Sequence, residues 1–250
     1  MLAGLGAAAL LAPLAACGDE DRLDGLAKGP EGRVTGIANG DAFDLEGHER
    51  VRLAGIEAPK GDLPYAMEAE RALSRLAEGR RVKLYFGGAH ADLFGRTIAQ
   101  VRDADSRAWL QLSLLDQGAA RVRTWADNRA LARVLLAHEA RARAANRGLW
   151  ALPAYRVRLP QEVEPPDHGL FLVEGRVRRV GEGGGGIYLD FADDWRGTLS
   201  LQTPRRALKD FRAAGLDPLD LEGRLIRVRG TVNDLRMTVD HPEQIERLKG

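Results

Sequence analysis

The chain has 250 residues, of which 44% are hydrophobic and 29% charged, a balance typical of folded proteins that excludes a largely disordered chain. Its 37 basic and 36 acidic side chains leave a formal net charge of +1, so any contact with nucleic acid must come from a local patch. A single cysteine excludes an internal disulfide and a multi-cysteine zinc site.

The amino-terminal residues 2–16 carry no charged side chain, and an acidic stretch follows at 19–21. This apolar run is too short to span a bilayer, which takes about 20 residues. An apolar run at the start of a chain that ends in small residues is typical of a secretory signal. Residues 14–17 (Leu-Ala-Ala-Cys) resemble the lipobox of bacterial lipoprotein signals.

That resemblance implies that residues 1–17 are a lipoprotein signal peptide and that Cys17 carries a diacyl anchor in the mature chain. More than one acyl chain gives stable membrane anchoring. We therefore expect export, with a lipid anchor in the outer face of the bacterial inner membrane or in the outer membrane on its periplasmic side. Residues 18–30 are expected to form a flexible tether. The signal departs from its family in having no Lys or Arg after Met1, and a buried apolar helix is the alternative.

The next part of the chain, residues 31–152, has the pattern of a mixed domain. Polar and apolar residues alternate in segments that predict strands at 33–37, 42–45, 50–54, 81–86 and 97–102. Asn-Gly-Asp at 39–41 predicts a hairpin turn between the first two. Apolar spacings near three and four predict helices over 65–78, 110–117 and 128–146.

The remainder of the chain predicts a linker and a second domain. Residues 153–168 are proline-rich and read as a linker or a covering strap. Strand patterns at 170–180, 187–191, 197–201 and 224–232, with a helix over 205–214, predict a small OB-like barrel within residues 169–250. The whole chain is thus predicted to be mainly β with α (α+β). The second barrel has no catalytic cluster, and it is expected to bind single strands, to cover part of the first domain or to meet another protein.

Four short motifs follow one another in the first domain. They are Asn-Gly-Asp-Ala-Phe at 39–43, Arg-Leu-Ala-Gly-Ile-Glu-Ala-Pro at 52–59, Asp-Leu-Phe-Gly-Arg at 92–96 and Asn-Arg-Gly-Leu-Trp at 146–150. In this order and at these separations they resemble the staphylococcal nuclease (thermonuclease) family, over about residues 32–151. The resemblance implies an OB-fold barrel with three helices and hydrolysis of phosphodiester bonds in DNA and RNA with calcium.

The resemblance also implies roles for individual residues. Asp41 and Glu57 match the two carboxylates of the calcium site, and Arg52 and Arg96 match the two arginines that clamp the phosphate. A guanidinium fork suits that task, because it can donate two parallel hydrogen bonds to one phosphate. Without the motifs, Arg52 reads as a strand residue with an exposed end and Arg96 as a turn residue paired with Asp92.

The position after the Ala-Pro pair departs from the family, because Lys60 stands where a glutamate acts as general base. A protonated ammonium cannot take a proton from water, and loss of a general base costs about 10²–10⁴ in rate. The extra positive charge also weakens attraction for Ca²⁺ and favours a phosphate. Asp62 is an alternative base. This part of the site is therefore expected to hold a phosphodiester more than to cut it.

One aromatic residue, Trp125, precedes the long helix where the family has tyrosines that stack on the substrate base, shifted by one position. Stacking on Trp125 would contribute about 1–3 kcal/mol per base, and packing against the barrel is the alternative. The five histidines show no ligand spacing and are expected at the surface.

Together these features favour an exported, lipid-anchored binding protein for nucleic acid or another phosphodiester ligand, with impaired catalysis and weakened Ca²⁺ binding. An active calcium-dependent phosphodiesterase and a non-catalytic envelope interaction protein are the two alternatives.

Overall fold

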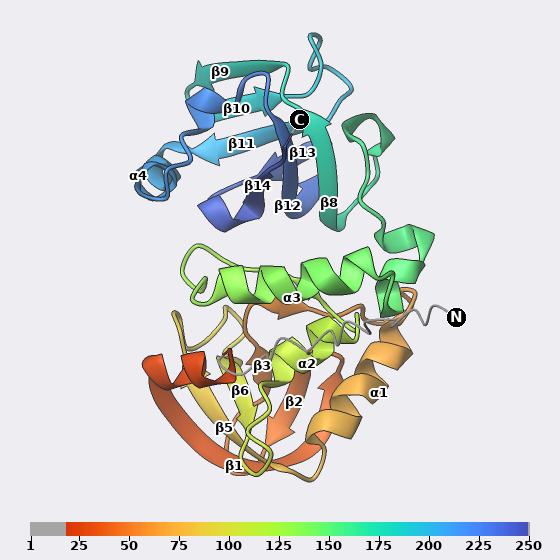
Figure 1. The fold of residues 1–250 in the computed structure, drawn as a ribbon, viewed down its shortest axis with the longest axis vertical. Coiled ribbons are helices and arrows are strands. Elements are labelled where there is room, and N and C mark those ends of the chain that lie inside the picture. Colours follow the sequence, from red (N-terminus) through yellow and green to blue (C-terminus); the bar gives the residue numbers. More distant parts are fainter. Residues whose placement is uncertain (1–18, 250) are drawn as a thin grey trace, which may run out of the picture.

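The first domain is built around a closed five-stranded barrel (Figure 1). The structure, a computed structural model, describes residues 19–249. The barrel strands, in hydrogen-bonded order, are β1 (Ala27–Asn39), β2 (Ala42–Leu45), β3 (Val51–Leu53), β6 (Thr97–Asp103) and β5 (Arg81–Phe86). A separate two-stranded sheet joins β4 (Ile56–Glu57) to β7 (Arg121–Val122).

Three helices complete this domain: α1 (Ala66–Ala77), α2 (Leu110–Asp116) and α3 (Ala132–Ala144). The predicted barrel with three helices is therefore confirmed. Helix α3 begins at Ala132 and not at residue 128, because Leu131 adopts a left-handed conformation with φ 62°. The short η2 (Gly148–Ala151) ends the domain.

The amino-terminal part of the described chain is folded. Residues of η1 (Glu20–Gly25) precede β1, and Leu23 is fully buried in the core of the barrel domain. Strand β1 already pairs with β5 at Ala27. The prediction of a flexible tether over 18–30 was wrong for residues 20–30, because the acidic composition hid one apolar anchor and a long strand.

The predicted signal peptide and Cys17 lie outside the described residues. Within residues 19–249, no helix is both long enough and apolar enough to cross a membrane.

The second domain is a seven-stranded sheet with one helix, α4 (Leu208–Ala213). Its strands are β8 (Gly169–Arg176), β9 (Arg179–Gly183), β10 (Gly186–Asp190), β11 (Ser200–Pro204), β12 (Leu225–Asn233), β13 (Arg236–Thr238) and β14 (Ile245–Arg247). The order is β14-β12-β13-β11-β10-β9, and β8 pairs with β12. Among the described residues β14 and β9 are the two ends of this order, so a second barrel stays a prediction.

The segment between the domains follows the surface of the second one. It contains η3 (Pro153–Tyr155) and η4 (Pro160–Glu162), and the Arg158 backbone N–H donates to the Leu172 carbonyl of β8 at 2.9 Å. The proline-rich segment thus acts as a strap over β8.

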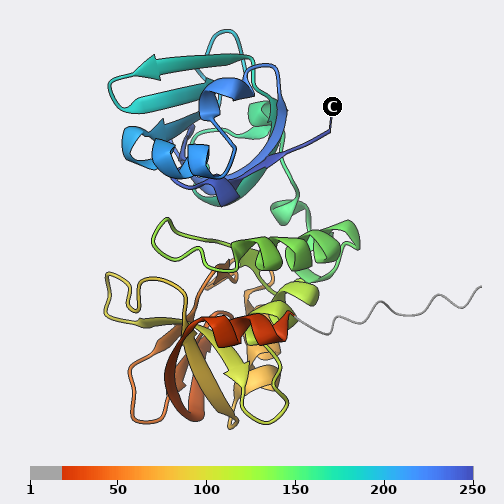
Figure 2. The same ribbon diagram turned by 60° about the vertical axis from the view of Figure 1, so that its left-hand side comes forward.

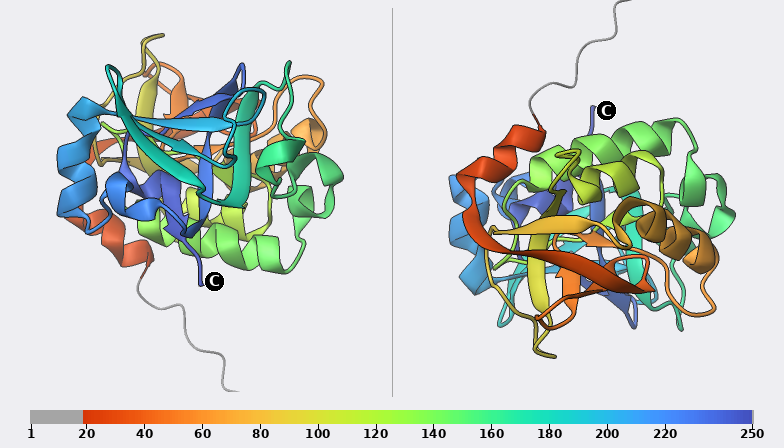
Figure 3. Two further views of the ribbon diagram at one scale, coloured as in Figure 1. Left: turned by 90° about the horizontal axis from the view of Figure 1, so that it is seen from above. Right: turned by 90° about the horizontal axis from the view of Figure 1, so that it is seen from below.

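Helix α3 lies between the barrel and the second domain in two views (Figures 1 and 2). Seen from above and below, the two domains overlie one another (Figure 3). Arg229 of β12 donates to both carboxylate oxygens of Glu139 on α3, at 2.7 and 3.1 Å. The Arg229 and Glu139 side chains are 3% and 0% exposed, so each buried charge is stabilised by its partner in the other domain.

Candidate functional site

The turn between β1 and β2 carries Asp41. The Asp41 backbone N–H donates a hydrogen bond to Asn39 Oδ1 at 3.0 Å, which fixes the turn. Gly40 is required here, because a Cβ would lie 2.7 Å from Ala69 of α1 and 2.8 Å from Ala58. This close approach places the fully buried Asp41 carboxylate against residue 58, whose N–H donates to Oδ2 at 3.0 Å.

Lys60 ends on the same carboxylate. Its Nζ donates to Asp41 Oδ2 at 2.7 Å, while the other oxygen, Oδ1, is buried and accepts no hydrogen bond. The Lys60 side chain is 37% exposed, so the ammonium joins a buried carboxylate to solvent. The residue in the predicted base position therefore neutralises one of the two predicted metal carboxylates.

Glu57, the second predicted metal carboxylate, is also occupied by cations. Strand β4 places it opposite Arg121 of β7. Its carboxylate accepts a short hydrogen bond from Arg123 Nη1 and lies 3.8 Å from Arg121 Nη2. Burial lowers the pKa of Arg121, and the nearby Glu57 charge opposes that shift.

The two predicted phosphate arginines lie on neighbouring parallel strands or at their start. Arg52 is on β3 and pairs in register with Ile98 of β6, and Arg96 directly precedes β6. Arg96 donates to the carboxylate of Asp92 at 2.7 Å, the turn contact that the alternative interpretation expected. Burial alone would raise the pKa of Asp92, but hydrogen bonds from Arg96 and from backbone N–H groups lower it.

Arg52 differs from the other cations of the site. It is only 8% exposed, and within residues 19–249 its guanidinium makes no hydrogen bond or ion pair. A buried guanidinium without a counter-charge is unfavourable, so this group favours an incoming anion.

These side chains surround one cavity of about 610 Å³. Its lining includes the predicted site residues Arg52, Glu57, Lys60, Arg96 and Trp125. The rest of the lining comes from Ala91, Asp92, Leu93, Phe94, Ile98, Arg123 and Asp127. The structure therefore brings together all the predicted site residues that it describes, apart from Asp41, which lies behind Lys60.

Asp62, Asp127 and Trp125 differ in their position relative to this cavity. Asp62, the predicted alternative base, is exposed and does not line the cavity. Asp127 does line it, and in the described part of the chain its carboxylate has no hydrogen bond or ion pair. Trp125 is 41% exposed, with the Arg123 guanidinium 4.6 Å from its ring centroid, so it is not packed in the core.

The residues of this site do not fit a calcium ion. Calcium takes six to eight oxygen ligands and depends on their negative charge, whereas Lys60 covers Asp41 and Arg123 covers Glu57. In the part of the chain that the structure describes, no group of three or more His, Cys, Asp or Glu residues could hold a metal ion.

Sequence reasoning missed Arg121 and Arg123, the cations on Glu57, because their contact depends on the pairing of two very short strands. It also placed all histidines at the surface, which was wrong for His138 and His241, at 5% and 1% exposed. His241 is held between Asp240 and Thr124, with both contacts at 2.7 Å. Only the folded arrangement of the two domains creates that contact.

Comparison with known proteins covers the part of this site that follows residue 50. Residues 50–152 match the family model of staphylococcal nuclease homologues. Over 103 residues the chain is 37% identical to a "Probable staphylococcal-like nuclease" of Oryza sativa subsp. japonica, and a second rice protein of that description is 36% identical. Each alignment covers 41% of this chain and about a quarter of the relative, 26% and 25%.

A fungal relative extends over a longer stretch. A "Probable endonuclease" of Verticillium alfalfae is 28% identical over 174 residues, which are 55% of this chain and 60% of the relative. The chain thus spans only part of each of these proteins. The barrel and the three helices agree with the family match, so the part of this chain that is similar to the staphylococcal nuclease homologues is residues 50–152 of the first domain.

Proposed function

We propose that the first domain binds a phosphodiester ligand, foremost nucleic acid, and hydrolyses it poorly or not at all. The observation that carries this proposal is Arg52, a buried cation that lines the cavity and has no protein counter-charge among the described residues. A phosphate oxygen pair matches its planar fork.

Arg96 lines the same cavity and supports the same ligand. Its guanidinium is held by Asp92, which fixes its position but offsets its charge. A phosphate bound between Arg52 and Arg96 would gain one uncompensated cation and one oriented donor, which favours weak to moderate affinity.

Impaired catalysis rests on the ion pairs of the two acidic residues. Activation of water needs a base, and Lys60 is a donor with no acceptor capacity when protonated. Lys60 and Arg123 also take up the negative charge that would attract a divalent cation.

The test is binding of a fluorescent oligothymidylate to the full-length chain in EDTA, measured by anisotropy. Arg52→Ala is expected to weaken binding about 10- to 100-fold, the equivalent of a hydrogen bond to a charged group at about 1.5–3 kcal/mol. Each lost phosphate contact should also reduce the salt dependence of log K by about 0.7 for a single strand. Arg75→Ala, an exposed arginine on α1 outside the cavity, is the matched control.

A cleavage assay with calcium on the same samples decides between binding and catalysis. Robust calcium-dependent cleavage by the native chain that Arg52→Ala abolishes would overturn the proposal of impaired catalysis. If the native chain neither cleaves nor binds the oligonucleotide, the alternative of a non-catalytic interaction protein is favoured. Lys60→Glu alone is expected to restore little calcium binding, because Arg123 still covers Glu57, whereas Lys60→Glu combined with Arg123→Ala should restore more.

One observation favours the active phosphodiesterase as a second candidate. The unpaired Asp127 carboxylate lines the same cavity as Arg52 and could accept a proton there. If the native chain cleaves, Asp127→Asn should reduce the rate at least about 100-fold, as for loss of a general base. An unchanged rate would remove Asp127 from consideration.

Lipid anchoring at Cys17 remains part of the proposal for location. Its support is the apolar run and the Leu-Ala-Ala-Cys sequence at 14–17. Mass spectrometry of the mature amino terminus tests it: a diacylated Cys17 is expected, and an unmodified terminus upstream of Cys17 would refute it. Cys17→Ser should release the protein from the membrane fraction.

A further inference from the structure

Residues 121–124, which include β7 and carry the two cations near Glu57, are held by the second domain. Each of the four residues 121–124 is hydrogen-bonded to the second domain, at distances between 2.6 and 3.2 Å. The contacts are Arg121 Nη1 to the Leu170 carbonyl, Arg229 Nη1 to the Val122 carbonyl, Arg123 Nη2 to Thr231 Oγ1, and Thr124 Oγ1 with His241 Nε2. The segment beside the first cavity is therefore shaped by both domains.

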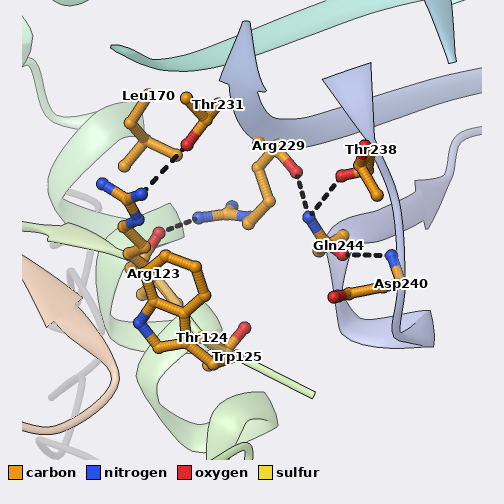
Figure 4. A pocket seen from close by; sticks show the side chains of 11 residues that line it. Arg123, Thr124, Trp125, Leu170, Arg229, Thr231, Thr238, Asp240 and Gln244 are labelled. Atoms are coloured by element: carbon orange, nitrogen blue, oxygen red, sulfur yellow. Dashed lines mark hydrogen bonds between the residues drawn. The ribbon is translucent and has the colours of Figure 1, made fainter. Parts of the chain in front are cut away.

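A second cavity, of about 190 Å³, lies along this boundary (Figure 4). It shares Arg123 and Trp125 with the first cavity. From the second domain it is lined by Thr231 and Thr238, which stand on β12 and β13, and by Asp240. The two cavities thus meet at one guanidinium and one partly exposed indole.

The chemistry of the second cavity suits a nucleoside better than a phosphate. Its hydrogen bond with His241 lowers the pKa of Asp240, so that carboxylate is ionised at neutral pH. An ionised carboxylate repels a phosphate but accepts hydrogen bonds from amino and hydroxyl groups of a base or sugar. The hydroxyls of Thr231 and Thr238 add groups that both donate and accept.

The shared edge supplies a stacking surface. Trp125 is 41% exposed, and the Arg123 guanidinium lies 4.6 Å from its ring centroid, held at one end by Glu57 and at the other by Thr231. An indole fixed in this way can stack against any base without reading its identity.

We infer that the binding site continues from the first domain into the second, and that the two cavities together take a single-stranded nucleic acid. One phosphate lies at Arg52 and Arg96, a base stacks on Trp125, and the neighbouring nucleoside enters the cavity beside Thr231 and Asp240. This inference rests on the proposed function, since it extends the same ligand.

The test compares a thymidine mononucleotide carrying two phosphates with a thymidine tetranucleotide, both bound to the full-length chain in EDTA and measured by calorimetry. The native chain is expected to bind the tetranucleotide at least about 5-fold more tightly, the equivalent of one additional stacked base at about 1 kcal/mol. Thr238→Trp fills the second cavity, and it should reduce the tetranucleotide affinity to that of the mononucleotide while leaving the mononucleotide affinity unchanged.

Asn233→Trp is the matched control, because it adds the same ring on the β12–β13 hairpin outside both cavities. It should change neither affinity. Equal affinity for the two ligands, or a tetranucleotide affinity that Thr238→Trp leaves unchanged, would overturn the extension into the second domain while the proposed function stands. If the native chain binds neither ligand, the proposed function fails, and this inference fails with it.

Discussion

The two acidic residues of the site are neutralised in different ways. Asp41 is fully buried and receives its cation from Lys60, a residue of the same domain. Glu57 is partly exposed and receives Arg123, whose other guanidinium nitrogen donates to Thr231 of the second domain.

The difference separates a local device from one that depends on assembly. The Asp41 pair depends on the turn and the loop after β4, so it should persist whenever the barrel is folded. The Glu57 pair depends on β12, which is itself fixed to α3 by Arg229 and Glu139. One half of the site is therefore coupled to the position of the second domain, and variants can test each half separately.

The largest loss of stability is expected at the boundary between the two domains. Arg229→Ala leaves the fully buried Glu139 carboxylate without its main counter-charge, which should reduce the free energy of unfolding by about 3–5 kcal/mol. Urea denaturation measures this, with Arg178→Ala as control, since that arginine is 55% exposed and lies 4.0 Å from a carboxylate that is 88% exposed. An effect below about 1 kcal/mol would contradict a coupled boundary. Arg229→Met with Glu139→Met should recover part of the loss, because both members of this buried ion pair are removed together, while Val122 N–H and Arg143 lose their acceptor.

A smaller effect is expected at the local pair. Lys60→Met removes the ammonium from the buried Asp41 and should cost about 1–3 kcal/mol, the range for a buried acceptor that loses its partner. Lys83→Met is the control, since the Lys83 ammonium has no hydrogen bond or ion pair in the described residues. If Lys60→Met and Lys83→Met unfold at the same urea concentration, the Asp41 pair has no structural importance.

The local half of the site could be predicted from the sequence. Asp41 and Arg52 lie in short motifs whose geometry is set by a hairpin and by neighbouring strands, and Lys60 directly follows the second of these motifs. The sequence therefore indicated these site residues and the unusual positive charge at position 60.

The other half could not be predicted, because its contacts join residues far apart in the chain. Arg123 and Thr231 are separated by 108 positions, and neither lies in a motif. Leu23 was missed for a related reason, since a single apolar residue in an acidic segment has no periodicity to detect. His241 similarly looked isolated until folding placed Thr124 beside it.

Removing the inter-domain hydroxyl gives a more selective perturbation of Glu57. Thr231→Val keeps the side-chain shape and removes the acceptor for Arg123, which should cost about 0.5–1.5 kcal/mol in unfolding free energy. Thr198→Val, whose hydroxyl donates within its own loop, is the control for loss of a hydroxyl. If the Asp41 and Glu57 pairs are independent, the losses of unfolding free energy in Thr231→Val and Lys60→Met should add in the double variant, because independent sites are additive. A strongly non-additive result would show that the two halves are one network.

The smallest expected effect is a dependence on pH at the boundary. His241 lowers the pKa of Asp240 from its ordinary value near 3.8. A carboxylate with a depressed folded-state pKa stabilises the fold above the unfolded value, and that contribution is lost as pH falls through the folded-state pKa. Asp240→Asn should therefore be less stable than the native chain at neutral pH, by less than about 1 kcal/mol because the carboxylate is partly exposed and screened by water.

The difference between Asp240→Asn and the native chain should shrink as the pH is lowered below about 4, the range in which Asp240 becomes protonated. Thermal unfolding at a series of pH values measures it, and Asp193→Asn, at an 88% exposed carboxylate, is the control. A constant difference across that range would mean that the ionised Asp240 does not support His241. The contact between His241 and Thr124 would then depend on packing alone, and the hold of the second domain on residues 121–124 would be independent of charge at Asp240.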